Sequence, residues 1–326
     1  MPEGDTLYRV ARTLNQVLAN QVVRRFDSVY PPLLRIEEEA PLVGRTVLRV
    51  EARGKWCLIW IGPLSYHGGE PVSGTTPTGR PPLPGRWDGI LILATHLRMN
   101  GMWHIYRAGA TPDRDEKWQR PARDMRVLLA TASFVTVAFR VPVAELLTVA
   151  ELERHPIIGR LGPDLLGEQF DESEALRRLR ARTDDELGQA LLTQSALAGL
   201  GNVYKSEVCF LAGQNPFTPV RALPEPTLRH VLAISRRLLR DNVVSAGTGG
   251  GDSSAPPVVT FLGLRRTTAA MTPGARLWVY GRAGQPCRRC ATAIRQARQG
   301  PDARVTFYCP RCQPAIGHHD FPPLVR

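Results

Sequence analysis

The chain has 326 residues, 43% of them hydrophobic and 22% charged, a balance that excludes collagens, coiled coils and wholly disordered chains. Lysine and arginine outnumber the acids by 42 to 30, and the formal net charge of +12 favours an anionic partner such as nucleic acid. No apolar run approaches the roughly 18 residues of a membrane span, and residues 1–5 (MPEGD) lack the apolar core of a secretory signal. We therefore expect a cytoplasmic protein without a membrane segment.

The first half of the chain changes from a helical to a strand-like pattern. Residues 5–19 carry apolar side chains at helical spacing, and Asp5 is suited to cap the start of that helix. Short strands follow from residue 22 to 139, most clearly at 46–50, 56–60, 89–94 and 134–139. Residues 66–88 interrupt them with five glycines and five prolines, which predicts a flexible insertion.

The second half is helical and ends in a basic segment. Helices are expected at 172–182, 185–194, 203–212 and 225–242, and a second flexible loop at 245–257. Residues 265–326 contain 11 arginines, no lysine and two acids. The expected domains are therefore 1–148, 149–264 and 265–326, with 66–88 as an insertion in the first.

Four cysteines of the basic segment have the spacing of a zinc site. Cys287 and Cys290 form one CxxC pair, 18 residues precede the second pair, and Cys309 and Cys312 complete it. Each pair presents two thiolates to one tetrahedral metal ion. Because four thiolates leave no open coordination position, we expect one structural zinc ion and no catalytic metal. A small zinc module this rich in arginine favours a nucleic-acid contact over a purely structural ribbon.

Residues 191–207 end one helix and begin another. Gly199 and Gly201 permit a tight turn, and Asn202 fits the N-cap of the second helix. The amides at such a helix start suit a phosphate, and Lys205, one turn further on, could reinforce it. A helical hairpin of the core is the alternative. In combination with the basic cysteine module, the segment favours phosphate binding.

Three motifs in this order resemble the formamidopyrimidine-DNA glycosylase and endonuclease VIII family: residues 1–4 (MPEG), 192–207, and 278–282 (WVYGR) with the CxxC pairs. The resemblance implies an α+β multidomain fold. An N-terminal β-sandwich flanked by helices precedes a helical helix–two-turn–helix domain and a C-terminal zinc finger, and damaged double-stranded DNA lies in the cleft between the domains. It also implies a monomeric DNA glycosylase and abasic-site lyase of base excision repair, associated with the bacterial nucleoid.

The resemblance assigns chemistry to three residues of the N-terminal half. Pro2, freed by loss of Met1, matches the family's nucleophile, which forms a Schiff base at C1′ of the sugar. An α-amino group is less basic than lysine, so more of it is free base near neutral pH. Glu3 matches the catalytic acid that protonates the sugar ring oxygen and later shuttles protons. Lys55 matches a hairpin lysine that contacts phosphate near the lesion.

Three further positions match the family's DNA contacts. Asn202 matches the phosphate-binding asparagine of the helix–two-turn–helix motif, and Arg304 matches the zinc-finger arginine that straddles phosphates. Met99 resembles the apolar wedge that fills the gap left by an extruded nucleotide, for which an unbranched, flexible side chain is well suited. A methionine of the hydrophobic core is the alternative for Met99.

The chain departs from the family pattern in three places. Thr6 stands where many members have a second glutamate, and Thr193 stands where an acid usually precedes the glutamine. The stretch 137–142 lacks the Arg-Arg-Phe-Gly run of the formamidopyrimidine branch. This absence favours the endonuclease VIII branch, most like its actinobacterial second homologues, and therefore oxidised pyrimidines as substrates. An oxidised-purine glycosylase and a non-catalytic damaged-DNA-binding protein of the same fold are the alternatives.

Overall fold

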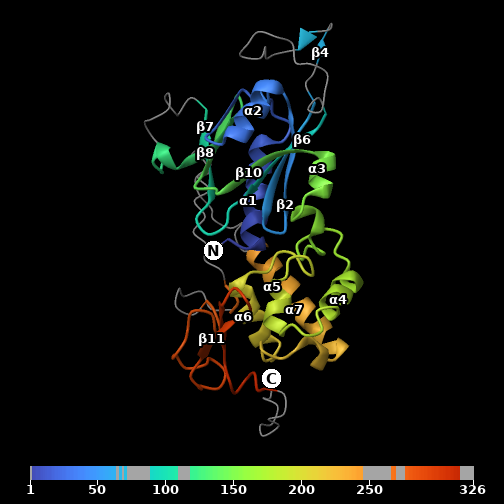
Figure 1. The fold of residues 1–326 in the computed structure, drawn as a ribbon. Coiled ribbons are helices and arrows are strands. Elements are labelled where there is room, and N and C mark those ends of the chain that lie inside the picture. Colours follow the sequence, from blue (N-terminus) through green and yellow to red (C-terminus); the bar gives the residue numbers. More distant parts are fainter. Residues whose placement is uncertain are drawn as a thin grey trace. The chain divides into compact units, whose positions relative to one another are not determined.

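The computed structural model describes residues 2–63, 66–67, 70–71, 89–108, 118–244, 266–268 and 276–315. They form two compact units, each with its own hydrophobic core (Figure 1). The first unit contains Pro2 and the described residues from Thr6 to Arg160. The second contains Glu3–Asp5 and the described residues from Leu161 onward. Both flexible segments expected from composition lie largely outside the described residues, as does the C-terminal tail after residue 315.

Two antiparallel four-stranded sheets form the framework of the first unit. One sheet has the order β1-β8-β9-β7 and the other β10-β6-β3-β2. The first consists of β1 (Arg25–Ser28), β7 (Met102–Arg107), β8 (Met125–Ala130) and β9 (Phe134–Phe139). The second consists of β2 (Val47–Arg53), β3 (Trp56–Ile61), β6 (Leu91–His96) and β10 (Val143–Thr148). The expected strands are confirmed with shifts of a few residues at their ends.

Side chains from both sheets meet in one core, as in a β-sandwich. Ile59 and Leu93 from one sheet and Trp103 and Leu129 from the other belong to the same buried cluster. Helix α1 (Gly4–Leu18) adds the apolar face that its sequence predicted, including Leu7, Val10, Leu14 and Leu18. The prediction that Asp5 caps this helix is wrong. The helix begins at Gly4, so Asp5 lies inside its first turn, where a carboxylate still complements the helix dipole.

Two helices of the first unit were not predicted. Helix α2 (Pro31–Glu39) begins with two prolines, which look like a strand breaker in sequence but are well tolerated in the first turn of a helix. Helix α3 (Val149–Arg154) begins directly after β10, with a capping box between Thr148 and Glu151. The short strands β4 (Tyr66–His67) and β5 (Glu70–Pro71) are the described part of the expected insertion.

The second unit is helical with a small β-hairpin. It contains α4 (Glu172–Arg180), α5 (Leu187–Leu192), α6 (Asn202–Leu211) and α7 (Glu225–Val244), close to the four helices expected, although α5 is shorter. Strands β11 (Arg295–Gln299) and β12 (Arg304–Tyr308) form the antiparallel hairpin between the two cysteine pairs, beside α6 (Figure 1). Short 3₁₀ turns are Ala122–Asp124, Ile158–Arg160 and Val220–Ala222.

Helix α6 is unusual because it is buried from Asn202 to Phe210 and yet carries several polar side chains. Apolar residues of α6 and α7, such as Tyr204, Val208 and Leu232, share the core of this unit. The polar residues of α6 therefore lie at contacts with other segments, where each requires a partner.

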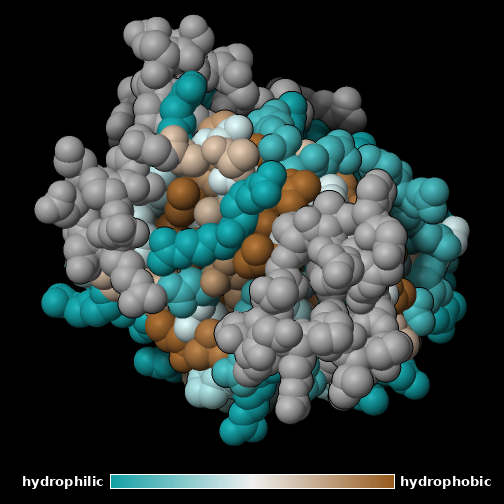
Figure 2. All heavy atoms as spheres, turned by 90° about the horizontal axis from the view of Figure 1, so that it is seen from above, coloured by the Kyte–Doolittle hydropathy of each residue, from teal (hydrophilic) through white to brown (hydrophobic). Residues whose placement is uncertain are grey.

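The described surface is mixed in polarity. Figure 2 shows hydrophilic side chains running between small groups of hydrophobic ones on the face seen from above. Among the helices that the structure describes, none is long and apolar enough to cross a membrane. Large hydrophobic side chains that are exposed in the described residues are Val29, Leu34, Leu48, Met99 and Ile157.

Candidate active site, metal centre and nucleic-acid interface

The carboxylate of Glu3 is fully buried at the start of α6. Its Oε2 accepts hydrogen bonds from the amides of Gly201, at 2.9 Å, and Tyr204, at 3.3 Å, and its Oε1 accepts one from the amide of Val203 at 2.9 Å. The N-terminal end of a helix stabilises such a negative charge. These amides were expected to bind a phosphate. That expectation is corrected, because Glu3 already occupies them.

Glycines allow this close approach. A Cβ on Gly201 would lie 2.3 Å from Cδ of Glu3, and a Cβ on Gly4 would lie 2.9 Å from the backbone of Gly199. The amide of Gly4 donates to the carbonyl of Gly199 at 2.8 Å, and Gly199 has a φ of +108°. The position of Glu3 therefore depends on the absence of a side chain at Gly4, Gly199 and Gly201.

Pro2 directly precedes Glu3 and is partly exposed, whereas Met1 lies outside the described residues. Thr6, which replaces the family's second glutamate, is 1% exposed in the first turns of α1. The buried carboxylate next to Pro2 is thus that of Glu3, and the position of Thr6 supplies a hydroxyl instead of an acid.

In the first unit, Lys55 lies in the turn between β2 and β3, after Gly54 with a φ of +59°. The next residue, Trp56, pairs with His96 at the end of β6. The lysine is close enough to His96 for its charge to contribute to lowering the pKa of the imidazole. The structure therefore places the hairpin lysine beside the turn that follows β6.

That turn presents the expected wedge residue. Arg98 has a φ of +45°, and the amide of Gly101 donates to the carbonyl of Leu97 at 2.9 Å, which closes the turn. Met99 lies between them and is 62% exposed. The alternative of a core methionine is therefore wrong, since this side chain is outside the hydrophobic cluster and free to contact another molecule.

His96 supports this turn and was not identified from the sequence. Its Nδ1 accepts the amide of Arg98 at 3.1 Å, and its ring packs edge-on against Trp56 at 5.0 Å. Burial, followed by the charges of Lys55 and Arg98, lowers the pKa of His96 to about 4. The imidazole is consequently neutral at physiological pH, with Nδ1 as the acceptor. A histidine two residues before a left-handed turn residue was the only signal in the sequence.

Asn202 is the first residue of α6 and not its N-cap, which is Gly201. Its Nδ2 donates to the carbonyl of Val305 at 2.8 Å, and the side chain is 8% exposed. Its Oδ1 is buried without a hydrogen-bond partner among the described residues. The expected phosphate-binding asparagine thus already joins α6 to the zinc hairpin through one N–H and retains a second N–H.

Lys205 differs from the expectation of a phosphate contact. The side chain has no exposed surface, and its Nζ donates to Oγ1 of Thr306 in β12 at 2.6 Å. Burial is the largest cause that lowers the pKa of Lys205, to about 8. A side chain enclosed in this way does not reach a phosphate on the protein surface, so its contacts within the protein must explain its presence.

Glu207 is a second buried carboxylate that was not identified from the sequence. It accepts hydrogen bonds from the amides of Trp278 and Val279 at 2.9 Å and from the amide of Tyr280 at 2.8 Å. It also accepts a hydrogen bond from the hydroxyl of Thr267. The start of the WVYGR motif is therefore held by α6. Only its position in α6, two residues after Lys205, could have indicated this role.

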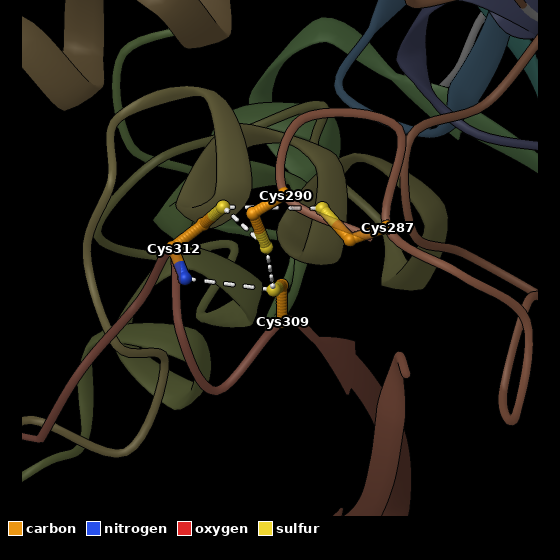
Figure 3. A group of neighbouring side chains, drawn as sticks. All are labelled: Cys287, Cys290, Cys309 and Cys312. Carbon is orange, nitrogen blue, oxygen red and sulfur yellow. Dashed lines mark hydrogen bonds between the residues drawn. The ribbon is translucent and has the colours of Figure 1, made fainter. Parts of the chain in front are cut away.

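The four cysteines of the two CxxC pairs point toward one another at the base of the hairpin (Figure 3). All four sulfur atoms lie within 4.8 Å of one another, and the Cys290 sulfur is 3.4 Å from those of Cys309 and Cys312. A tetrahedral zinc ion with bonds of about 2.3 Å requires sulfur separations of about 3.8 Å. The geometry of the cluster therefore fits a tetrahedral zinc ion closely, as the spacing predicted.

The surface of this module is basic. Arg304, at the start of β12, is half-exposed and forms a long ion pair of 3.6 Å with the exposed Asp302. Such a surface pair is weak and readily exchanged for a phosphate. The exposed arginines of the module are Arg288, Arg289, Arg295, Arg298, Arg304 and Arg311.

Comparisons with known proteins agree with this combination of fold and site. Residues 1–141 match the formamidopyrimidine-DNA glycosylase N-terminal domain, residues 161–253 match the H2TH domain of the same glycosylase, and residues 284–315 match the zinc finger found in FPG and IleRS. The chain belongs to the formamidopyrimidine-DNA glycosylase and endonuclease VIII family.

Its relatives include the endonuclease 8 branch. The chain is 38% identical over 316 residues to "Probable endonuclease 8 2" of Streptomyces coelicolor, covering 96% of this chain and 94% of the relative. It is 32% identical over 315 residues to "DNA-(apurinic or apyrimidinic site) lyase Nei2" of Mycolicibacterium smegmatis, covering 97% and 100%. The formamidopyrimidine-DNA glycosylase of Lactococcus lactis, solved with DNA containing an abasic site, shares the fold with a TM-score of 0.69, 22% identity and coverage of 96% and 100%.

The environment of His96 predicts a pH dependence of stability. Its pKa is about 4 in the folded protein and near 6.5 when unfolded, so the unfolded state binds the proton first as the pH falls. The stability that depends on neutral His96 should therefore be lost between pH 6.5 and 4. Urea unfolding at several pH values should show the wild type losing stability relative to His96→Asn over this range. Parallel stability curves for the two proteins would contradict the assignment.

Proposed function

We propose that the protein is a bifunctional DNA glycosylase and abasic-site lyase of base excision repair that removes oxidised pyrimidines. The observation that carries the proposal is the fully buried carboxylate of Glu3, which directly follows Pro2 and accepts hydrogen bonds from three amides at the N-terminal end of α6. The printed names of the relatives, endonuclease 8 and abasic-site lyase, support the same reaction. The partner is damaged double-stranded DNA, which the protein binds as a monomer.

The reaction begins at the secondary amine of Pro2 after removal of Met1. The nitrogen lone pair forms a bond to C1′ while the glycosidic bond breaks and the base departs with its electron pair. Glu3 accepts the proton that the Pro2 nitrogen loses on forming this bond and transfers it to the sugar ring oxygen, so that the ring opens and the nitrogen and C1′ form an iminium. Loss of a proton from C2′ then expels the 3′ phosphate and cleaves the strand. The fixed orientation of Glu3 serves both proton transfers, because its amide partners cannot move independently of α6.

Contacts to the DNA backbone position the lesion. Lys55, Asn202 and Arg304 bind phosphates, and Met99 fills the space left by the extruded nucleotide. The exposure of Met99 and the weak ion pair of Arg304 support these roles. We also propose that the chain functions as three domains, 1–148, 149–264 and 265–326.

The preference for oxidised pyrimidines follows from the absence of the purine branch's Arg-Phe wedge. In the stretch 137–142, Phe139 is fully buried in an apolar cluster with Tyr106 and Trp118. Its neighbour Arg140 pairs with Asp124 at 2.7 Å. The buried Phe139 cannot contact the base opposite a lesion, whereas Arg140 is an exposed surface arginine. Many oxidised pyrimidines stack poorly, so extruding them costs less and a single flexible wedge suffices.

An oxidised-purine glycosylase is the second candidate. The chain is 31% identical over 278 residues to "Formamidopyrimidine-DNA glycosylase" of Ralstonia nicotianae, covering 83% of this chain and 84% of the relative. This identity is close to the 32–33% of two mycobacterial relatives, although it is below the 38% of the Streptomyces coelicolor relative. Sequence similarity alone therefore separates the two substrates poorly.

Borohydride trapping tests the enzyme against a binding protein that does not turn over. Sodium borohydride should reduce the iminium and leave the protein covalently attached to abasic-site DNA. Mass spectrometry should locate the attachment at Pro2. Protein that retains Met1 is the matched control, since it keeps every side chain but buries the proline nitrogen in a peptide bond. Full lyase activity with Met1 attached would refute the mechanism.

A single-turnover comparison tests the substrate class. Excision of thymine glycol opposite adenine should be faster than excision of 8-oxoguanine opposite cytosine in otherwise identical duplexes. Changing the base opposite thymine glycol should have little effect, because Met99 makes no base-specific hydrogen bond. Faster release of 8-oxoguanine would favour the second candidate and leave the family assignment standing.

The cysteine cluster predicts one zinc ion per chain. Cys290→Ser should release it, unfold the hairpin and strongly weaken DNA binding, because metal ligation supplies much of the folding free energy of so small a module. Metal analysis and DNA titration measure both effects. Cys57→Ser is the matched control, as it changes a buried cysteine of the first unit outside the cluster. Purified protein without bound zinc would contradict the prediction.

A further inference from the structure

A chain of buried hydrogen bonds runs from α6 through the zinc hairpin to the segment before α5. Nζ of Lys205 donates to the hydroxyl of Thr306 at 2.6 Å, and this hydroxyl donates to Oε1 of Gln299 at 2.8 Å. Nε2 of Gln299 then donates to Oε2 of Glu186 and to the carbonyl of Pro216, both at 2.8 Å. Lys205 and Thr306 have no exposed surface, and Gln299 is 5% exposed.

The direction of every bond in this chain is fixed. The carboxylate of Glu186 and the carbonyl of Pro216 can only accept hydrogen bonds, so the Nε2 of Gln299 must face them and its Oε1 must face Thr306. The hydroxyl proton of Thr306 is therefore directed to Gln299, and its lone pair accepts from Lys205. Removing one member would leave a neighbour buried without its partner.

The same face of α6 holds three consecutive residues of β12. Asn202 donates to the carbonyl of Val305, Lys205 binds the hydroxyl of Thr306, and the amide of Phe307 donates to Ser206 at 3.2 Å. Positions i, i+3 and i+4 of a helix share one face, which explains how the three side chains meet one strand. This register fixes the strand that begins with Arg304.

A buried lysine is a costly way to fill this space. Burial is the largest cause that lowers its pKa to about 8, and the nearby charge of Arg304 contributes to this lowering. An apolar side chain of similar length would avoid the cost of removing a charge from water. It could not hold the hydroxyl of Thr306, however, and the strand would lose its fixed register against α6.

We infer that Lys205 is a positioning residue for DNA binding. Through Thr306 it locks β12 onto α6, and so holds Arg304 and Asn202 as one rigid phosphate-binding surface. The inference rests on the proposed roles of Arg304 and Asn202 in binding the DNA backbone. Lys205 itself touches no DNA.

A double-mutant cycle on an undamaged duplex tests the inference. Lys205→Met and Arg304→Ala should each weaken binding about tenfold and reduce the slope of log K against log salt by about one, the loss of one phosphate contact. The double variant should bind about as tightly as either single variant, because a mispositioned Arg304 has little left to lose. Independent, additive losses would overturn the inference.

Thr306→Ser and Thr306→Val provide a matched pair at the other end of the hydrogen bond. Serine keeps the hydroxyl and should bind DNA within twofold of the wild type, whereas valine keeps the shape and should reproduce the defect of Lys205→Met. Both variants should retain zinc. Equal binding by the serine and valine variants would overturn the inference, even if Lys205→Met fails to fold.

Steady-state turnover separates positioning from general destabilisation. Lys205→Met should raise KM for abasic-site duplex about tenfold and change kcat much less. A fall of kcat as large as the rise of KM would mean that the hydrogen bond between Lys205 and Thr306 only supports the fold. Loss of zinc by Thr306→Val but not by Thr306→Ser would mean the same. Failure of borohydride trapping by the wild type would refute the proposed enzyme, whereas additive binding losses in a protein that is trapped normally would refute only the role of Lys205.

Discussion

The second unit depends on one physical constraint, which is that the charged and polar side chains buried with α6 must each find a partner. Glu3 closes the N-terminal end of the helix, and Glu207 holds the amides of residues 278–280. Lys205 and Asn202 reach β12. Since an unpaired buried charge would cost several kcal/mol, these contacts fix which segments surround the helix. The proposed catalytic acid, phosphate ligands and zinc hairpin are thereby attached to one element.

The first unit uses a different principle. Its two sheets and α1 bury an apolar core, and the proposed DNA-contacting residues lie in turns at the strand ends. Lys55 lies in the β2–β3 turn and Met99 in the turn after β6. Trp56 of β3 pairs with His96 of β6, which brings those turns together. His96 also accepts a hydrogen bond from the amide of Arg98, which holds the second turn. A rigid sheet thus holds a cation and an exposed apolar side chain in neighbouring turns.

The burial of Lys205 shows that not every positive charge of this protein is available to an anionic partner. Two cations of unit two lie near one another, but only Arg304 is exposed. The buried cation costs stability, whereas the exposed one is available to an anion. Positive charge in the sequence therefore serves two purposes, and net charge does not distinguish them. Burial decides, because a phosphate can be bound only by a donor that it can reach without dehydrating the protein interior.

From short-range spacing and periodicity, the sequence alone predicted the cysteine cluster, the strands of the sandwich and the four helices of the second unit. Its motifs in addition resembled those of the family that the comparisons show. It did not determine that the amides at the start of α6 bind Glu3, that Asn202 follows the helix cap, or that Lys205 is enclosed. Those facts depend on residues about 100 to 200 positions apart in the chain. Only tertiary packing decides which of a side chain's potential partners lies near it and whether the side chain stays in contact with water. The local sequence pattern contains neither the distance to the partner nor the exposure of the side chain.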